Sequence, residues 1–325
     1  MTDYIKVPVR DQRCAVLTFA RAKGALEPED IKKRFPDPRK IVVEEKYDGS
    51  RFMLIVQGQT VQLRSRHVST KTRELGDKTA NFPHLQGLEG WFVLDGEILP
   101  SGGESFSDVG SVVLSLPAKA IAWQEKHGLA AYYAFDILVH NNVDVRNLPF
   151  SKRRELLLKT VFFIHKSCHN PHVVMPAQWP GKEAVQVFEN IVKYRGEGVM
   201  VKELDAPYGK GWYKVKKHRD TCAIITGFTE GRGKYKGQIG AIKFSVFDTK
   251  NKQPVLIEVG QCSGMEDSIR KYISLKPLKY MGKVLEVRAQ EIAAKGRLRH
   301  PRFVRIRHDY NKEECTLQKL YDDFA

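Results

Sequence analysis

Five short segments of the sequence combine lysines, arginines and carboxylates at spacings that could do chemistry. The first, Glu44–Arg51, places Lys46 before an Asp-Gly pair, between two predicted strands. Lys-x-Asp-Gly alone is weak evidence, because a lysine in a turn is commonly a surface charge and Asp-Gly suits a turn in any case. In Trp212–Lys216, strand alternation points Lys214 and Lys216 to the same face. Two cations on one face of an aromatic-flanked strand are either exposed at the edge of a sheet or bind phosphate.

The other three segments carry carboxylates. Leu94–Ile98 is interpreted as a tight turn at a strand end with two acids, which alone is a common hairpin turn. Tyr133–Leu138 is an apolar strand interrupted by Asp136, a residue type that often forms hydrogen bonds at strand ends. Glu197–Lys202 places a carboxylate and a lysine at the two ends of one predicted strand. Each segment alone therefore has a purely structural explanation.

In this order and spacing, the five segments together resemble the covalent nucleotidyltransferases, which are the ATP-dependent DNA and RNA ligases and the mRNA capping enzymes. The resemblance covers the chain from Val42 to Asp309. Each motif is weak to moderate by itself, whereas five in series are strong. A sixth segment, His300–Asp309, resembles the C-terminal motif of DNA ligases, which orients the pyrophosphate leaving group when a barrel domain closes over ATP.

The resemblance implies that Lys46 attacks the α-phosphate of ATP, expels pyrophosphate and carries AMP. A free lysine has a pKa near 10.4, so at neutral pH almost all of it is protonated and unable to attack. Nearby cations favour the neutral amine, and the candidates are Lys202, Lys214 and Lys216. The implied cofactors are ATP and Mg²⁺, with Mn²⁺ able to substitute for the metal.

The resemblance also assigns the other site residues. Glu97 and Glu197 correspond to carboxylates that bind the metal and the ribose, and Phe135 to the aromatic that stacks on adenine. Glu44 corresponds to a side chain at the adenine edge, and Met200 is placed to cover the other side of the base. The full set implied to bind the nucleotide is Glu44, Lys46, Arg51, Arg66, Glu97, Phe135, Met200, Lys202, Lys214, Lys216 and Arg305.

Arginines complete the predicted site. Arg51 and Arg66 match arginines that touch the nucleotide and the nick phosphate. Arg305 and Arg307 alternate onto one face of the last segment. The thirteen residues ending at Arg307 hold six cations and no acid, so a nucleic-acid-binding strip without a catalytic role is the alternative. Many relatives have lysine directly after the final aspartate, but this chain has Tyr310, which leaves the handling of pyrophosphate open.

Around these segments, the residue pattern predicts an α+β protein with two domains. Residues 1–221 would form a nucleotidyltransferase (adenylation) domain of antiparallel sheets with flanking helices, and residues 222–325 an OB-fold β-barrel. Strands are predicted at Ile41–Glu45, Phe52–Val56, Val61–Arg66, Trp91–Leu94, Ala131–Leu138 and Gly198–Lys202. Helices are predicted at Lys152–Val161, with Ser151 as N-cap, and at Lys182–Arg195, ended by Gly196 in a left-handed cap. The barrel strands are predicted at Cys222–Phe228, Ala241–Phe247, Val255–Gly260, Val284–Ile292 and Phe303–His308, with the helix Glu266–Ser274 between the third and fourth.

Composition points to a polyanionic partner. The chain has 325 residues, 42% of them apolar, which is enough for two domains with their own cores. Its net charge of +16 is an electrostatic footprint for nucleic acid, although a solvated basic surface is the alternative. About half of the surplus lies in the last third of the chain.

The cysteines and histidines exclude other classes of protein. Five scattered cysteines without a Cys-x-x-Cys pair argue against a disulfide scaffold or a zinc module, and the ten histidines lack metal-ligand spacing. Any metal should therefore be a hard cation held by carboxylates and phosphates. No apolar stretch approaches the roughly 20 residues that span a bilayer, and the first residues do not resemble a signal peptide. We expect a cytoplasmic protein, bacterial or viral, that is not secreted.

The remaining features select among the relatives. A capping enzyme uses an Asp-Lys pair that is absent here, and many RNA ligases lack the barrel, whereas Arg302–Asp309 is closest to the DNA ligase form. A catalytically silent nucleic-acid-binding protein is expected to lose the nucleophile or the metal carboxylates, and this chain keeps them. We therefore expect a minimal two-domain ATP-dependent DNA ligase, a monomer that seals 3′-OH/5′-phosphate nicks in duplex DNA. An RNA ligase or a capping guanylyltransferase is the alternative.

Overall fold

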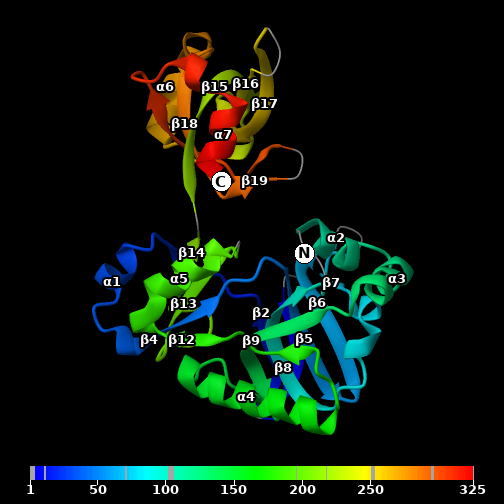
Figure 1. Ribbon diagram of the computed structural model, residues 1–325. Coiled ribbons are helices and arrows are strands. Elements are labelled where there is room, and N and C mark those ends of the chain that lie inside the picture. Colours follow the sequence, from blue (N-terminus) through cyan, green and yellow to red (C-terminus); the bar gives the residue numbers. More distant parts are fainter. Residues whose placement is uncertain are drawn as a thin grey trace. The chain divides into compact units, whose positions relative to one another are not determined.

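The computed structural model describes residues 4–10, 12–69, 72–101, 106–194, 196–216, 218–249, 253–293 and 296–324. The chain divides into two compact units, Met1–Lys216 and Lys217–Ala325 (Figure 1). The boundary predicted after Thr221 falls later than this division, because Thr221 lies inside strand β15 (Arg219–Glu230) of the second unit.

The largest sheet of the first unit has two buried faces. In spatial order it contains β10 (Val143–Asp144), β9 (Ala131–His140), β8 (Gly90–Leu99), β5 (Ser50–Gly58), β6 (Thr60–Val68) and β7 (Leu75–Asp77), and β11 (Val173–Val174) pairs in parallel with β9. Side chains alternate along β5, so Phe52, Leu54 and Val56 enter one core while Met53 and Ile55 enter another. Because both sets are apolar, both faces of this sheet must be covered.

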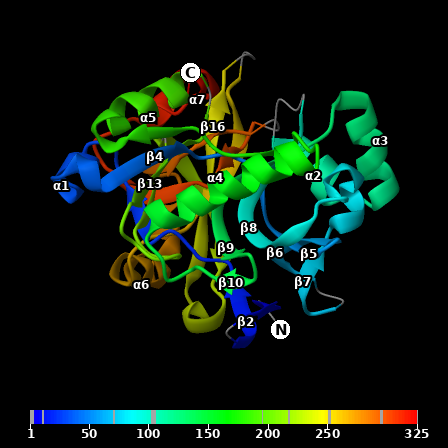
Figure 2. The same cartoon turned by 90° about the horizontal axis from the view of Figure 1, so that it is seen from below.

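Helices cover one face of the large sheet and a hairpin covers the other. The helices are α2 (Phe106–Val113), α3 (Pro117–His127) and α4 (Phe150–Ser167), and α4 runs along the sheet in Figure 2. Its buried side chains Leu157, Val161 and Ile164 recur at helical spacing. The hairpin consists of β1 (Tyr4–Val9) and β2 (Gln12–Thr18), which contribute Val7 and Leu17 to the second core.

The second sheet of the first unit has one covered face. Its order is β12 (Gln178–Pro180), β4 (Ile41–Glu45), β13 (Gly198–Glu203), β14 (Trp212–Lys216) and β3 (Gly24–Leu26). Helices α5 (Ala184–Lys193) and α1 (Asp30–Arg34) pack on Val43, Val199 and Val201. The 3-10 turns of this unit are η1 (Pro38–Lys40), η2 (Thr79–Asn81), η3 (Pro83–Leu85) and η4 (Gly181–Glu183). The alternate residues of β4, β13 and β14 point to the opposite face of the sheet.

The two predicted helix ends were wrong in detail. Helix α4 begins at Phe150, directly after Pro149, so Ser151 lies inside the helix and is not its N-cap. Helix α5 ends at Lys193, and Gly196 does not have the left-handed conformation. A Cβ on Gly196 would lie 2.4 Å from Ile191 Cγ2, so this glycine is needed for close packing on the helix. Arg195, which was included in the predicted helix, lies outside the described residues.

The tight turn predicted at Leu94–Ile98 was also wrong. These residues lie within β8, which continues to Leu99 and pairs with both β5 and β9. The ladder to β9 has an irregularity between Asp95 and Gly96. A Cβ on Gly96 would lie 2.5 Å from the Tyr132 ring, so the glycine makes room for that ring and does not form a turn.

The second unit contains the predicted barrel strands. Their spatial order is β17 (Val255–Cys262), β16 (Ile239–Asp248), β15 (Arg219–Glu230), β18 (Val284–Ala289) and β21 (Arg302–Arg307), and helix α6 (Asp267–Leu275) lies between the third and fourth in sequence, as predicted. The two edge strands approach at the bridge between Ser263 and Arg302, which closes the sheet. The remaining elements are β19 (Glu291–Ile292), β20 (Leu298–Arg299), η5 (Gly233–Tyr235), η6 (Pro277–Tyr280), η7 (Lys312–Glu314) and α7 (Leu317–Phe324).

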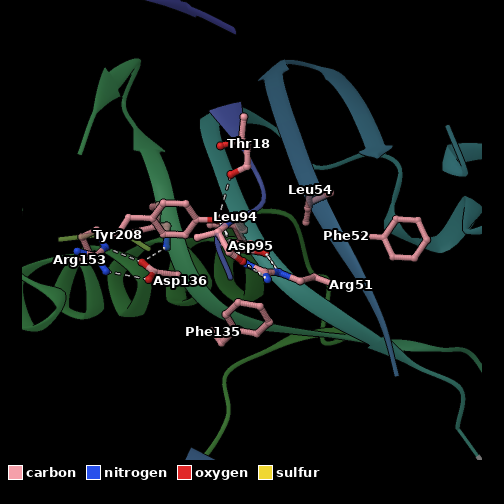
Figure 3. A network of polar contacts seen from close by, with 12 residues as sticks. Thr18, Arg51, Phe52, Leu54, Leu94, Asp95, Phe135, Asp136, Arg153 and Tyr208 are labelled. Atoms are coloured by element: carbon pink, nitrogen blue, oxygen red, sulfur yellow. Dashed lines mark hydrogen bonds and ion pairs between the residues drawn. The ribbon is translucent and has the colours of Figure 1, made fainter. Parts of the chain in front are cut away.

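A buried ion pair fixes α4 to the large sheet. Arg153 donates from Nε and Nη2 to the two carboxylate oxygens of Asp136 in β9, at 2.7 and 2.9 Å (Figure 3). Its Nη1 donates to the carbonyl oxygens of Leu148 and Ala206. Both side chains are inaccessible to solvent.

Across the described residues, no helix is both long and apolar enough to cross a membrane.

We predict that Arg153→Ala lowers the free energy of unfolding by about 3–5 kcal/mol, because it leaves the buried Asp136 carboxylate without its cation. Lys152→Ala in the same helix removes only an exposed ion pair with Glu155 and should change stability by about 0.5 kcal/mol or less. Urea unfolding measures both. Equal losses in the two variants would contradict a structural role for the buried pair.

Candidate active site

A pocket of about 520 Å³ lies in the first unit and is lined by both of its larger sheets. Its walls are Arg21, Ala22, Glu44, Glu45, Lys46, Tyr47, Arg51, Arg66, Glu97, Phe135, Pro176, Met200, Lys202, Trp212, Lys214 and Lys216. Every residue predicted to bind the nucleotide is in this set, except Arg305, which belongs to the second unit. Six further residues line the pocket without a predicted role: Arg21, Ala22, Glu45, Tyr47, Pro176 and Trp212.

The strand register of the second sheet brings distant residues to one wall of the pocket. Met200 in β13 pairs with Glu44 in β4 and with Lys214 in β14, and Glu44 pairs in turn with Gln178 in β12. Side chains of paired residues lie on the same face of a sheet. The predicted alternation of Lys214 and Lys216 agrees with the pocket, because both line it.

Lys46 follows β4 directly and shares a carboxylate with a second lysine. The Glu197 carboxylate accepts from Lys46 Nζ on one oxygen and from Lys216 Nζ on the other. The Lys46 backbone N–H donates to the Gly198 carbonyl at 2.9 Å. Gly198 has φ of 140°, and a Cβ there would lie 2.1 Å from the Val215 carbonyl oxygen, so only glycine allows this approach of β13 and β14.

Glu44 is a buried carboxylate that contacts two donors, a lysine and a glutamine, and a nearby arginine, which come from three elements. Lys202 Nζ lies 2.6 Å from Glu44 Oε2, and both side chains are about 2% exposed. Gln178 Nε2 donates to Oε1 at 3.1 Å, and Arg154 Nη1 lies 3.4 Å from the same oxygen. Lys202 also donates to the Phe135 carbonyl at 3.0 Å. The charge of Lys202 is therefore balanced by Glu44, and its contacts fix both the carboxylate and the backbone beside the aromatic ring.

The aromatic wall of the pocket surrounds the buried ammonium group. Lys202 Nζ lies 5.1 Å from the centroid of the Phe135 ring, 4.6 Å from that of Phe150 and 5.1 Å from that of Trp212. Phe135 and Trp212 meet edge to face, with centroids 6.2 Å apart. These cation–π contacts restrict the Phe135 ring, which lines the pocket.

Arg51 is locked into a network with Asp95 and Tyr208 (Figure 3). Its Nε and Nη2 donate to the Asp95 carboxylate at 2.9 and 2.5 Å, and its Nη1 donates to the Ala20 carbonyl at 2.6 Å. Tyr208 donates its hydroxyl to the same carboxylate at 2.6 Å. Burial opposes the charge of Arg51, but Asp95 outweighs that effect and raises the pKa of the guanidinium. Arg51 therefore anchors the segment around Ala20 as well as lining the pocket.

Glu97 is the most strongly perturbed acid at the site. It lies opposite Arg51 in the pairing of β5 with β8. Burial raises the pKa of Glu97 to about 7, and the positive charges of Lys46 and Arg51 only partly oppose the shift. The negative charge of Glu197 acts in the same direction as burial. The anionic form of Glu97 thus lacks stabilisation that a cation at this place would supply.

The two carboxylates fit the predicted hard metal ion. Within the described part of the chain, no group of three or more His, Cys, Asp or Glu side chains is arranged to hold a metal. Mg²⁺ is commonly held by one or two carboxylates together with substrate phosphates and water, so such a group is not required. Glu97 and Glu197 carry carboxylate oxygens of the kind that Mg²⁺ prefers, and the charge of Glu197 acts on Glu97.

The C-terminal motif belongs to the second unit and has its own ion pairs. Arg305 and Arg307 both contact the carboxylate of Glu286 in β18, so they share a face as predicted. Arg307 also donates to Asp309, which lowers the pKa of that acid to about 2. The Arg307 guanidinium lies 5.2 Å from the centroid of the Tyr310 ring, so the tyrosine in place of the usual lysine packs on this arginine.

Family models match both units. The model for the ATP dependent DNA ligase domain matches residues 22–216, and the model for the DNA ligase OB-like domain matches residues 230–307. The chain belongs to the ATP-dependent DNA ligase family. The predicted fold class, a nucleotidyltransferase domain with an OB-fold domain, is confirmed.

Relatives and solved structures agree with the family. The chain is 28% identical over 330 residues to a DNA ligase of Methanoculleus marisnigri, covering 91% of this chain and 56% of the relative. It is 29% identical over 308 residues to a DNA ligase of Methanopyrus kandleri, covering 86% and 54%. The chain spans about half the length of these curated relatives. In fold it is similar to a structure from a study of Lig E DNA ligases, with a TM-score of 0.62 and 22% identity over 90% of this chain and 100% of the other.

We predict that Glu97→Gln stabilises the ligand-free, metal-free protein at pH 8 but not at pH 4. The pKa of Glu97 is raised in the folded protein, so its contribution to stability is present below about pH 4.5 and is lost as the pH rises to about 7. Glutamine is neutral throughout, so the variant should gain up to about 3 kcal/mol at pH 8, at about 1.4 kcal/mol per pKa unit.

Urea unfolding of this variant and the wild type at both pH values, in the presence of a chelator, measures the effect. Glu125→Gln, on the exposed part of α3, controls for the loss of one surface charge. A gain of equal size at pH 4 and pH 8 would show that burial does not perturb Glu97.

Proposed function

We propose that this protein is an ATP-dependent DNA ligase that seals 3′-OH/5′-phosphate nicks in duplex DNA, with Lys46 as the nucleophile that carries AMP. The observation that carries the proposal is the position of Lys46. It lies on the wall of a pocket with an aromatic face and a buried carboxylate edge, and it shares Glu197 with Lys216. The ligase family of the chain supports the same chemistry.

In the proposed first step, the neutral Lys46 amine attacks the α-phosphorus of ATP. A P–N bond forms, the bond from the α-phosphorus to the bridging oxygen breaks, and pyrophosphate leaves with the electron pair. Lys46 must first separate from Glu197 and lose a proton. Lys216 stays in place, where its positive charge can bind the phosphates of ATP. Mg²⁺ bound by Glu97 and Glu197 would neutralise phosphate charge during this displacement.

The other pocket residues bind and orient the nucleotide in this proposal. The Phe135 ring stacks on adenine, and Met200 covers the opposite side of the base. Glu44, fixed by Lys202, accepts a hydrogen bond at the adenine edge. Because the carboxylate is already oriented by Lys202 and Gln178, with Arg154 nearby, little rotational freedom is lost when adenine binds.

The next two steps transfer AMP to the 5′-phosphate of the DNA and then join the two strand ends. An oxygen of the 5′-phosphate at the nick attacks the phosphorus of the lysyl-AMP, and the Lys46 amine leaves. The 3′-hydroxyl then attacks the activated 5′-phosphate, loses its proton and expels AMP. The net charge of +16 supports backbone binding that is independent of sequence and weakens with salt. One chain suffices for these steps, so we propose a monomer that acts in the cytoplasm, where ATP and DNA are both present.

We predict that the wild-type protein forms a covalent adduct with α-labelled ATP and Mg²⁺, and that Lys46→Ala forms none. The adduct is followed by denaturing gel electrophoresis. Lys40→Ala, an exposed lysine that does not line the pocket, should label like the wild type. A labelled Lys46→Ala protein would place the nucleophile elsewhere.

Substrate choice separates the proposed ligase from its relatives. ATP should label the protein, whereas GTP labelling would indicate a capping enzyme and NAD labelling a different class of ligase. A nicked DNA duplex should be sealed faster than a nicked RNA duplex of the same sequence. Preference for the RNA nick would overturn the choice of DNA.

A further inference from the structure

Arg21 lines the same pocket but belongs to none of the sequence motifs. It lies in the connection between β2 and β3, and its side chain is exposed. The residues around it in sequence, Thr18–Gly24, contain no pattern typical of a nucleotide site. Its place on the pocket therefore depends on how this connection is held against the rest of the unit.

Hydrogen bonds fix the backbone on both sides of Arg21. The Ala20 N–H donates to the Tyr208 hydroxyl at 3.2 Å, and the Ala20 carbonyl accepts from Arg51 Nη1 at 2.6 Å. The Lys23 N–H donates to the Trp212 carbonyl at 2.8 Å. Figure 3 shows Arg51, Asp95 and Tyr208 converging beside Thr18. The Arg21 side chain thus begins from an anchored position at the pocket wall.

Four of the other cations that line the pocket have acidic partners. Asp95 pairs with Arg51, Glu44 pairs with Lys202, and Glu197 is shared by Lys46 and Lys216. Among the residues that the structure describes, the Arg21 guanidinium forms no hydrogen bond or ion pair. An arginine held at a pocket without a carboxylate partner can offer its planar fork to a phosphate, which it binds with two parallel hydrogen bonds.

We propose that Arg21 is a phosphate-binding residue of this site. The inference rests on the proposed ligase function and extends it to a residue outside the motifs. The phosphate comes either from the triphosphate of ATP or from the strand at the nick, and both have the same chemistry. The alternative is that Arg21 contacts no phosphate and only adds positive charge to the surface.

Lys23 offers a matched control for that alternative. It is an exposed cation two residues further along the same connection and does not line the pocket. Arg21→Ala and Lys23→Ala each remove one positive charge from the connection between β2 and β3. A difference between them therefore reports on contact and not on net charge. Arg21→Lys keeps the charge but loses the planar fork, so it should restore only part of the lost function.

Two assays separate the sources of the phosphate. In the first, the purified variants react with α-labelled ATP and Mg²⁺ without DNA, and the rate of adduct formation is measured against ATP concentration. In the second, the proteins seal a nicked duplex whose 5′-phosphate already carries AMP, with no ATP present. Thermal unfolding checks that the variants fold like the wild type.

Loss of a bidentate contact to phosphate should weaken the affected step by about tenfold or more. If Arg21 holds the triphosphate, Arg21→Ala raises the ATP concentration for half-maximal labelling and seals adenylated DNA normally. If it holds the DNA strand, labelling is normal and sealing of adenylated DNA is slowed. If Arg21→Ala matches Lys23→Ala in both assays while the wild type labels and seals, the inference is overturned and the ligase function stands. A wild-type protein that neither labels nor seals overturns both.

Discussion

The site depends on one carboxylate that is shared between two lysines. Glu197 accepts from Lys46, which directly follows β4, and from Lys216 in β14. It therefore links the end of β4 to β14, which lies on the far side of β13. The close approach at Gly198 makes this possible, because any side chain there would collide with the backbone of β14. The Lys46 amine, which we propose to be the nucleophile, is thereby kept at the pocket wall. Two more buried ion pairs, Glu44 with Lys202 and Asp95 with Arg51, repeat this pattern around the pocket.

Much of the fold was predictable because its strands are short runs of apolar and β-branched residues separated by turns. These runs indicated the strands around Lys46 and the positions of the barrel strands along the chain. The N-terminal strands β1 to β3 and the helices α1, α2, α3 and α7 were missed. These segments are short, between three and eleven residues, and short runs give a weak periodic signal. Two glycines were misinterpreted as a turn and a helix cap. Gly96 is required by the ring of Tyr132, which is distant in sequence but lies on the paired strand, and Gly196 is required by Ile191 in the preceding helix. The glycine itself does not reveal either contact.

The site residues that lie within the sequence motifs were predictable, and those outside the motifs were not. Ten of the eleven residues expected to bind the nucleotide line one pocket, because they lie on paired strands of two sheets. The partners that orient them were missed. Gln178 and Arg154 hold Glu44, and Tyr208 holds Asp95, yet they come from β12, α4 and a loop, where no spacing marks them. Such residues are found only when the chain is folded, since their contacts join segments that are far apart in sequence.

The central claim is that the Lys46 amine becomes bonded to AMP before any DNA is present. The most direct measurement is peptide mapping by mass spectrometry of the protein after incubation with ATP and Mg²⁺, under conditions that preserve a P–N bond. We predict that a single peptide, the one that contains Lys46, gains the mass of one AMP, and that fragmentation places it on that lysine. A protein that gains no AMP, or that carries it on another residue such as Lys216, would contradict the claim.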